Sequence, residues 1–287
     1  MTRRTFIENV ALGVVGAAPW PARAEELSGL SIGVMDTSLR LAGKLEAVAL
    51  ARELGFDGVQ VSIGRPGADS RLRLAARDLQ AQYVAEANKH NIRLTGTYLD
   101  VLHVNCLKND PLARKWVLEG IEITRNLKAP ILMMVFFGKC SLDTPEEIEA
   151  TVGPLRELAP VAKEAGVVLG FENTLSAEDN ARVLDRVGSE AVKVFYDVGN
   201  STNLGGFDVP TEIRRLGGER ICQFHFKDKG YMGEGKVDFP AVIRAIAAVG
   251  FRGFAVLETS SPSGSVADDL RRNLAYTRRL LEDVNKK

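Results

Sequence analysis

The stretch Ile221-Cys222-Gln223-Phe224-His225-Phe226-Lys227-Asp228 predicts a β-strand with two chemically different faces. Alternate side chains of a strand share a face, so Gln223, His225 and Lys227 lie on one side and the two phenylalanines on the other. We therefore expect the polar side chains to line a site and the aromatic side chains to pack against another layer.

Three other short apolar runs end in an acidic residue, namely Glu172, Asp197 and Glu258. With His225 they are spaced by roughly 25 to 33 residues, the length of one strand and one helix, so parallel neighbouring strands would bring all four to one rim of a barrel. One histidine and three carboxylates at one rim predict a site for one divalent metal ion (Mn, Co, Mg or Zn). The alternative is that each residue caps a loop or pairs with a surface cation.

The first 24 residues have the pattern of a signal peptide. Arg3 and Arg4 precede an apolar segment at residues 10–19 and an Ala22-Arg23-Ala24 sequence, which is typical of a twin-arginine signal with a cleavage site. The apolar segment is too short to serve comfortably as a membrane-spanning anchor, which is the alternative. We therefore predict cleavage after Ala24 and delivery by the twin-arginine export machinery to the periplasm or the exterior. No later segment has the length of a membrane span, so we expect a soluble mature chain without a stable membrane anchor.

Charge and cysteine content narrow the function classes further. The chain has 37 basic and 37 acidic residues and no basic cluster, which disfavours nucleic acid as a partner. Cys106, Cys140 and Cys222 are odd in number and form no CxxC pair, so we expect buried thiols and not a disulfide framework. These properties leave self-association of the chain open.

The rest of the sequence alternates apolar runs with amphipathic segments. We predict strands near 31–36, 58–63, 92–98, 130–137, 167–173, 192–198, 221–227 and 253–258, and helices near 43–54, 71–89, 111–127, 144–165, 178–187, 210–216, 239–249 and 265–283. Eight strands each followed by a helix predict a single (β/α)8 TIM-barrel domain over residues 25–287. A doubly wound open sheet is the second interpretation, but the sequence has no Gly-rich turn after the first strand.

Local signals mark several helix ends. Gly55 and Gly250 are each followed by a phenylalanine, the pattern of a left-handed helix end against which an apolar residue folds back. Asp143 or Thr144 is expected to cap the helix that begins at Pro145. Asp238 is expected to cap the helix that begins at Phe239.

Five motifs carry a resemblance to a known family: Gly170-Phe171-Glu172-Asn173, Tyr196-Asp197-Val198-Gly199-Asn200, Phe224-His225-Phe226-Lys227-Asp228, Gly233-Glu234-Gly235-Lys236-Val237-Asp238-Phe239 and Leu257-Glu258-Thr259. Across nearly the whole mature chain the sequence resembles the xylose isomerase-like TIM-barrel superfamily, often described as sugar phosphate isomerases/epimerases. The resemblance to its ketose 3-epimerase branch implies that Glu172, Asp197, His225 and Glu258 hold one Mn, Co or Mg ion. It also implies that the two glutamates act as acid and base.

The resemblance implies substrate contacts as well. Glu178 matches a substrate-binding Glu, whereas Asn200 stands where the epimerases have a substrate-binding His and Tyr231 where they have an Arg. These two departures argue against ordinary ketohexose 3-epimerisation.

Two further residues are candidates for substrate binding from their own positions. Lys227 shares a strand face with His225 and is expected either to face a substrate oxyanion or to pair with a rim carboxylate. His103 follows the third strand, on the side where barrel loops contact substrate, although a lone loop histidine is often only solvated. Gly233 and Gly235 suggest a tight turn more than a phosphate site.

These residues predict proton abstraction next to a carbonyl through an enediolate that a metal ion stabilises. Return of the proton gives epimerisation or isomerisation of a small carbohydrate, whereas loss of a β leaving group gives a dehydratase or lyase acting on an inosose or a 3-keto-glycoside. A non-catalytic sugar-binding barrel is a further alternative. An endonuclease IV-like phosphodiesterase is excluded, because its three-metal cluster needs more than the three histidines of this chain.

Overall fold

The computed structural model describes residues 29–67 and 70–286. The predicted signal peptide, residues 1–24, therefore lies outside the described residues. The elements follow one another as β1 (Leu30–Met35), α1 (Glu46–Glu53), β2 (Gly58–Ser62), η1 (Arg73–Ala75), α2 (Arg77–Lys89), β3 (Arg93–Tyr98), η2 (Asp100–His103), α3 (Pro111–Asn126), β4 (Ile131–Val135), η3 (Gly138–Cys140), α4 (Pro145–Ala165), β5 (Val168–Glu172), α5 (Ala177–Val187), β6 (Val192–Asp197), α6 (Val198–Asn203), α7 (Val209–Leu216), η4 (Gly218–Arg220), β7 (Ile221–Phe226), α8 (Phe239–Ala248), β8 (Gly253–Leu257) and α9 (Val266–Asn285).

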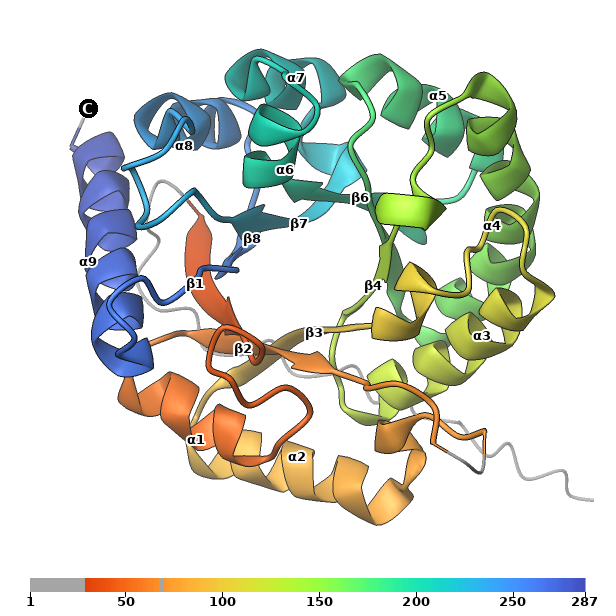
Figure 1. Ribbon diagram of the computed structural model, residues 1–287, viewed down its shortest axis with the longest axis horizontal. Helices are drawn as coiled ribbons and strands as arrows, with labels where there is room; N and C mark the ends of the chain where they lie inside the picture. The colour runs from red at the N-terminus through yellow and green to blue at the C-terminus, as the bar shows by residue number, and fades with distance from the viewer. Residues whose placement is uncertain (1–28, 68–69, 287) are drawn as a thin grey trace, which may run out of the picture.

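The strands close into a barrel in chain order, and the helices surround it (Figure 1). β1 pairs in parallel with β2 and also with β8, where Leu30 lies opposite Gly253 and Val34 opposite Leu257. This closure confirms the predicted (β/α)8 TIM barrel and excludes the open doubly wound sheet. Each strand lies within two residues of its predicted range, because a buried parallel strand is a nearly continuous apolar run.

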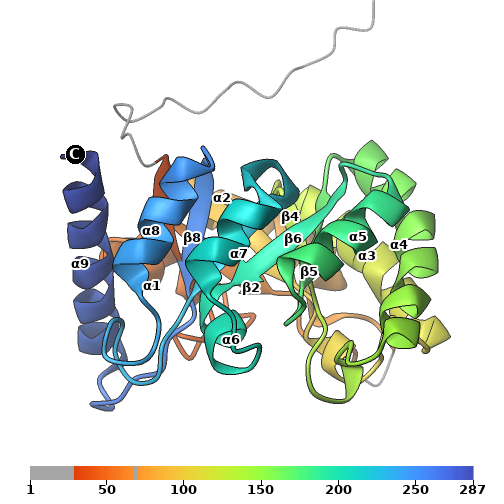
Figure 2. The ribbon, with the colours of Figure 1, turned by 90° about the horizontal axis from the view of Figure 1, so that it is seen from above.

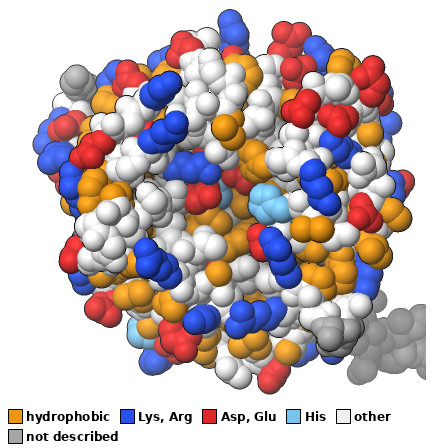
Figure 3. All heavy atoms as spheres, in the orientation of Figure 1, with side chains coloured by type: hydrophobic (Ala, Val, Ile, Leu, Met, Phe, Trp, Pro, Cys, Tyr) orange, Lys and Arg blue, Asp and Glu red, His pale blue; other side chains and the backbone are white. Residues whose placement is uncertain are grey.

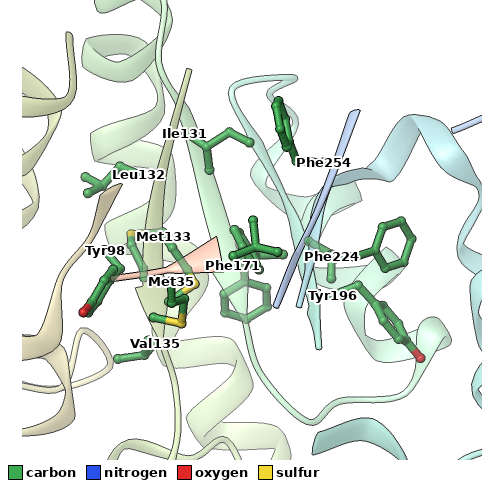
Figure 4. Packing of buried hydrophobic residues seen from close by; sticks show 14 of the residues in the cluster. Met35, Tyr98, Ile131, Leu132, Met133, Val135, Phe171, Tyr196, Phe224 and Phe254 are labelled. Carbon is green, nitrogen blue, oxygen red and sulfur yellow. The ribbon is translucent and has the colours of Figure 1, made fainter. Parts of the chain in front are cut away.

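Buried hydrophobic side chains lie on both faces of the strands. Figure 4 shows some of them, from β1, β3, β4, β5 and β8 among other strands. Phe224 and Phe226 of β7 are buried and contact Phe251 and Phe239 edge to face or tilted, with ring centroids 4.9 and 5.4 Å apart. The predicted split of β7 into an aromatic packing face and a polar face is thus confirmed.

Helix ends follow the expected local rules. Gly55 and Gly250 have φ angles of +97° and +66°, and the next residues, Phe56 and Phe251, are buried. Thr144 caps α4 by accepting a hydrogen bond from the backbone N–H of Glu147, and Asp238 caps α8 in the same way through Ala241. These caps fix where each helix meets the adjoining loop.

The strands all point their C-terminal ends toward the same rim, which is the side where α6 lies in Figure 2. Loops and short helices that follow the strands form this rim, and residues at the strand ends line its centre. Among the described residues no helix combines the length and the apolar character needed to cross a membrane.

Candidate metal centre

Four side chains from four consecutive strands meet at the C-terminal rim. Glu172 and Asp197 end β5 and β6, His225 lies one residue before the end of β7, and Glu258 follows β8. One donor atom from each lies within 4.8 Å of the donor atoms of the other three. Figure 3 looks onto this rim and shows acidic and basic side chains together in its central hollow. The structure thus brings together the residues that the sequence grouped as ligands.

The imidazole of His225 is the centre of the cluster. Its Nδ1 lies 2.9 Å from Glu172 Oε1, 3.1 Å from Glu258 Oε2 and 3.9 Å from Asp197 Oδ2. The edge of the ring packs against Phe195, with centroids 4.5 Å apart, and His225 is 1% exposed. The Nδ1 side of the ring therefore faces the three carboxylates.

Lys227 brings a positive charge to the same group. Its Nζ lies 2.8 Å from Asp197 Oδ2 and donates a hydrogen bond of 2.9 Å to Glu258 Oε2. A Cβ atom on Gly199 would lie only 2.4 Å from Lys227 Cγ and 2.8 Å from its carbonyl oxygen. The glycine therefore lets α6 approach the end of β7, and it leaves Lys227 room to reach both carboxylates.

The buried charges perturb one another strongly. Burial lowers the pKa of His225, but the carboxylates of Glu172 and Glu258 outweigh it and raise that pKa to about 10. Burial raises the pKa of Asp197 in spite of the nearby Lys227 ammonium. Burial also acts to raise the pKa of Glu258, but hydrogen bonds and positive charge from His225 and Lys227 bring it below its ordinary value. A cation that binds at Nδ1 must therefore displace a proton from the imidazolium.

The donor set fits a divalent cation. Asp197 Oδ2 is buried and has the Lys227 ammonium 2.8 Å away but accepts no hydrogen bond of normal geometry from the described residues, so this oxygen lacks its full set of partners. An imidazole nitrogen with three carboxylates is a ligand set used by Zn²⁺ and Mn²⁺. A divalent ion and the Lys227 ammonium would together balance the three carboxylate charges.

The remaining predicted substrate residues lie in different settings. Glu178 stands on α5 with its side chain 85% exposed, and its carboxylate pairs with Arg182. His103 is exposed at the end of η2 on the rim, and Asn200 lies on α6 with its backbone N–H donating to Asp197 Oδ1. Their roles toward substrate remain predictions. The pairing of Lys227 with rim carboxylates, by contrast, is confirmed.

Tyr231 is held by residues of the last helix. Its hydroxyl donates to Asp269 Oδ1 at 2.8 Å, and the guanidinium of Arg272 lies 3.7 Å from the centre of its ring. Position 231 is therefore occupied by a tyrosine whose ring is covered by the guanidinium of Arg272 from α9.

The turn at Gly233 and Gly235 is confirmed as a turn. The carboxylate of Asp228 accepts hydrogen bonds from the backbone N–H groups of Gly235 and Lys236. Gly233 has a φ angle of +82°. Asp228 already occupies two of the N–H groups that a phosphate would need.

The expectation of buried thiols is wrong for Cys106 and Cys140, and Cys222 is a thiol that is only partly buried. Cys106 and Cys140 form a disulfide, and Cys222 is the free cysteine. The two sulfur atoms come from the loops after β3 and β4, which are adjacent strands, so the fold brings together positions 34 residues apart. Neither the odd number of cysteines nor their spacing in the sequence indicates this disulfide.

Sequence reasoning also missed two buried polar residues near the rim. Gln60 of β2 is fully buried, and its Oε1 lies 2.7 Å from His225 Nε2. Asp36 follows β1, is fully buried, and accepts hydrogen bonds from the N–H groups of Gly43 and Ser62 and from the hydroxyl of Tyr98. A polar residue inside or just after an apolar strand is the signal that could have identified both.

A cavity of about 880 Å³ opens at the opposite, N-terminal end of the barrel, where Arg93, Lys193, Gln223 and Phe254 are among its lining residues. It contains none of the four ligand candidates. We therefore place the chemistry at the C-terminal rim, where TIM-barrel enzymes hold their catalytic residues.

Comparison with known proteins gives a family match that covers most of the chain. Residues 48–280 match the xylose isomerase-like TIM barrel family. A relative from Actinoplanes sp., a 2-epi-5-epi-valiolone 7-phosphate 2-epimerase, is 28% identical over 187 residues. That alignment spans 63% of this chain and 67% of the relative.

Solved structures share the fold. The structure of an L-ribulose 3-epimerase superposes with a TM-score of 0.73 at 20% identity, and the match covers 90% of this chain and 96% of that one. A structure of the IolI protein with a bound zinc atom gives a TM-score of 0.70 at 14% identity and covers 88% and 99%. At these identities the likeness shows the barrel fold.

Proposed function

The chain belongs to the xylose isomerase-like TIM barrel family, and from this premise we propose that it is a divalent-metal-dependent enzyme that epimerises or isomerises a sugar or keto-sugar. The observation that carries the proposal is the convergence of His225 Nδ1 with the carboxylates of Glu172, Asp197 and Glu258 in a buried cluster at the catalytic rim. The epimerase activity of the Actinoplanes relative and the bound zinc of the IolI structure support it.

The four cluster residues would hold the ion. When bound here, a divalent cation supplies positive charge that stabilises the negative oxygens of an enediolate. One of Glu172 and Glu258 would remove the proton next to the carbonyl. The carbon–hydrogen electron pair then forms the carbon–carbon double bond of the enediolate, and the π pair of the carbonyl moves to its oxygen. The other glutamate returns a proton to carbon, and return to the opposite face inverts the centre.

Lys227 has two functions in this proposal. With His225, its ammonium holds the pKa of Glu258 below the ordinary value and so keeps that carboxylate ionised. Its side chain is 22% exposed and that of Glu258 is 33% exposed, whereas Glu172 and Asp197 are almost completely buried. Lys227 and Glu258 are thus the pair that a substrate meets first, and the ammonium is placed to face a substrate oxyanion.

The same proton abstraction supports a second outcome. If the carbon next to the reacting centre carries a leaving group, the enediolate expels it and the enzyme is a dehydratase or lyase acting on an inosose or a 3-keto-glycoside. A non-catalytic sugar-binding barrel would retain the cation and turn over none of these substrates.

We propose a cyclic or glycosidic keto-sugar as substrate, because of the residues at positions 200 and 231. Tyr231 offers a hydroxyl that is already bonded to Asp269, and Asn200 offers an amide. Neither supplies the charge expected of the Arg and His that ketohexose 3-epimerases have at these positions. We expect weak activity on free ketohexoses, and efficient interconversion of fructose and psicose would contradict this.

We also propose that the enzyme is exported through the twin-arginine pathway. The Cys106–Cys140 disulfide supports an oxidising compartment. Replacing Arg3 and Arg4 together by lysine should leave uncleaved precursor in the cytoplasm, as followed by fractionation and immunoblotting. Undiminished periplasmic yield of that variant would contradict the assignment.

The decisive experiment measures metal and turnover on the same preparation. We expect about one equivalent of divalent metal per chain and activity on some of a panel of ketoses, inososes and 3-keto-glycosides. His225→Ala should lose most of the metal because one of four protein ligands is gone. His90→Ala, which removes a histidine paired with Glu86 on α2, is the control and should keep metal and activity. Full metal retention in His225→Ala would refute the site.

A further inference from the structure

Gln60 is the residue that contacts the imidazole of His225 on the side away from the carboxylates. Its Oε1 lies 2.7 Å from His225 Nε2, and both side chains are at most 1% exposed. The contact joins β2 to β7, two strands that do not pair with each other in the barrel. No other side-chain hydrogen bond to Nε2 is present in the described part of the chain.

The other end of the Gln60 amide contacts Met133 of β4. The amide Nε2 of Gln60 lies 3.4 Å from Met133 Sδ. A thioether sulfur can accept a weak hydrogen bond but has no proton to donate. The NH₂ group of the Gln60 amide is therefore the half that faces the sulfur, and the carbonyl oxygen is the half that faces the histidine.

The orientation of the amide determines what the histidine presents to the cluster. An amide oxygen can only accept, so His225 Nε2 must carry the hydrogen of the 2.7 Å contact. In the neutral ring the other nitrogen, Nδ1, then carries none and directs its lone pair at the space between the three carboxylates. Nδ1 is the only ring nitrogen near them.

We propose that Gln60, oriented by Met133, is a positioning residue that holds His225 in the Nε2–H form and so makes Nδ1 the metal ligand. The inference rests on the proposed metal-dependent function and adds to it a residue that touches neither metal nor substrate. Hydrogen bonds of this kind fix the orientation and tautomer of ligating histidines, and their loss lowers metal affinity by about 10- to 100-fold.

The test compares zinc affinities, measured by competition with a chelator of known affinity. Gln60→Met keeps the length of the side chain and removes the acceptor, and its zinc affinity should fall about 10- to 100-fold. Gln60→Glu keeps an oxygen that accepts from Nε2–H and should stay close to wild type. Met133→Leu removes the sulfur, so the Gln60 amide can then rotate and exchange its oxygen and nitrogen. Its loss of zinc affinity should be smaller than that of Gln60→Met.

The matched control is Gln223→Met. Gln223 is also buried and lies two residues before His225 on the same strand face, but it lines the cavity at the N-terminal end of the barrel, and its amide nitrogen has no hydrogen-bond partner among the described residues. Zinc affinity in this variant should equal that of wild type. Equal losses in Gln60→Met and Gln223→Met would overturn the proposal, because general loosening of the barrel interior would then explain both.

A second readout needs no variant. Nitrogen-15 NMR of zinc-loaded wild type should show a proton on His225 Nε2 and none on Nδ1, and the reverse pattern would overturn the inference. Unchanged zinc affinity in Gln60→Met would overturn it as well. Failure of the proposed metal site gives a different result, since wild type itself would then bind no zinc, and failure of the proposed catalysis appears as zinc binding without turnover.

Discussion

The Cys106–Cys140 disulfide gives a quantitative prediction about stability. Breaking it releases a loop with a sequence separation of 34 residues in the unfolded chain. The chain-entropy relation for a loop of this length gives about 3.8 kcal/mol at 25 °C, and measured disulfides usually contribute about 2–4 kcal/mol. We therefore expect reduction to lower the free energy of unfolding by about 2–4 kcal/mol.

Urea unfolding with and without reductant measures this difference. The double variant Cys106→Ser with Cys140→Ser should be as unstable as reduced wild type and should not respond to reductant. Cys222→Ser is the control, because Cys222 lies outside the disulfide, and it should lose stability on reduction just as wild type does.

A thiol titration of the oxidised protein, unfolded without reductant, checks the bond itself. One reactive thiol per chain is expected, from Cys222. Three thiols would refute the disulfide. A reduced protein with three titratable thiols and an unchanged free energy of unfolding would refute the loop-entropy reasoning.

Glu172→Gln and Glu258→Gln should each lower turnover by about 10²- to 10⁴-fold while keeping the fold, since an amide cannot accept the proton; metal content is measured in each variant, and a variant that keeps its metal and near-normal turnover would contradict the two-base mechanism. Asp36→Asn should reduce the pH dependence of stability. Burial raises the pKa of Asp36 to about 6 from an ordinary value of 3.8, so its contribution is fully present below about pH 4 and is lost as pH rises through 6. The loss is up to about 3 kcal/mol, and parallel pH profiles of wild type and variant in urea unfolding would refute it. Gly199→Ala should lower the free energy of unfolding by about 1–3 kcal/mol through overpacking, and it should lower turnover because the added methyl would displace Lys227. Normal stability and turnover would show that α6 shifts to accept the methyl without cost.

The barrel and the ligand set could be predicted because both depend on repeated local signals. Eight apolar runs separated by amphipathic helices allow few other topologies, and a polar residue at the end of each of four runs reaches the same rim in any closed parallel barrel. The prediction of Glu172, Asp197, His225 and Glu258 as one group needed only chain order and strand length.

Features that depend on pairs of distant residues could not be read from the sequence. The disulfide requires the loops after β3 and β4 to lie side by side, and the Gln60–His225 contact crosses the barrel. The helix α6 was missed for a different reason. Its six residues include Gly199 and two asparagines, which are poor helix formers, and its N-cap is Asp197 itself.

The four ligand candidates all come from the second half of the barrel, between β5 and β8. The first half contributes the loop with His103, the disulfide and the Asp36 network, none of which supplies a ligand candidate. The ion-binding side chains are thus encoded in one half of the chain, together with the predicted substrate contacts Glu178, Asn200 and Lys227. The first four β/α units could diverge or be exchanged with those of a relative while the four ligand candidates stay in place. Gln60 is the exception, since it ties the histidine to the first half, and an exchange that loses this side chain would carry its effect across the barrel.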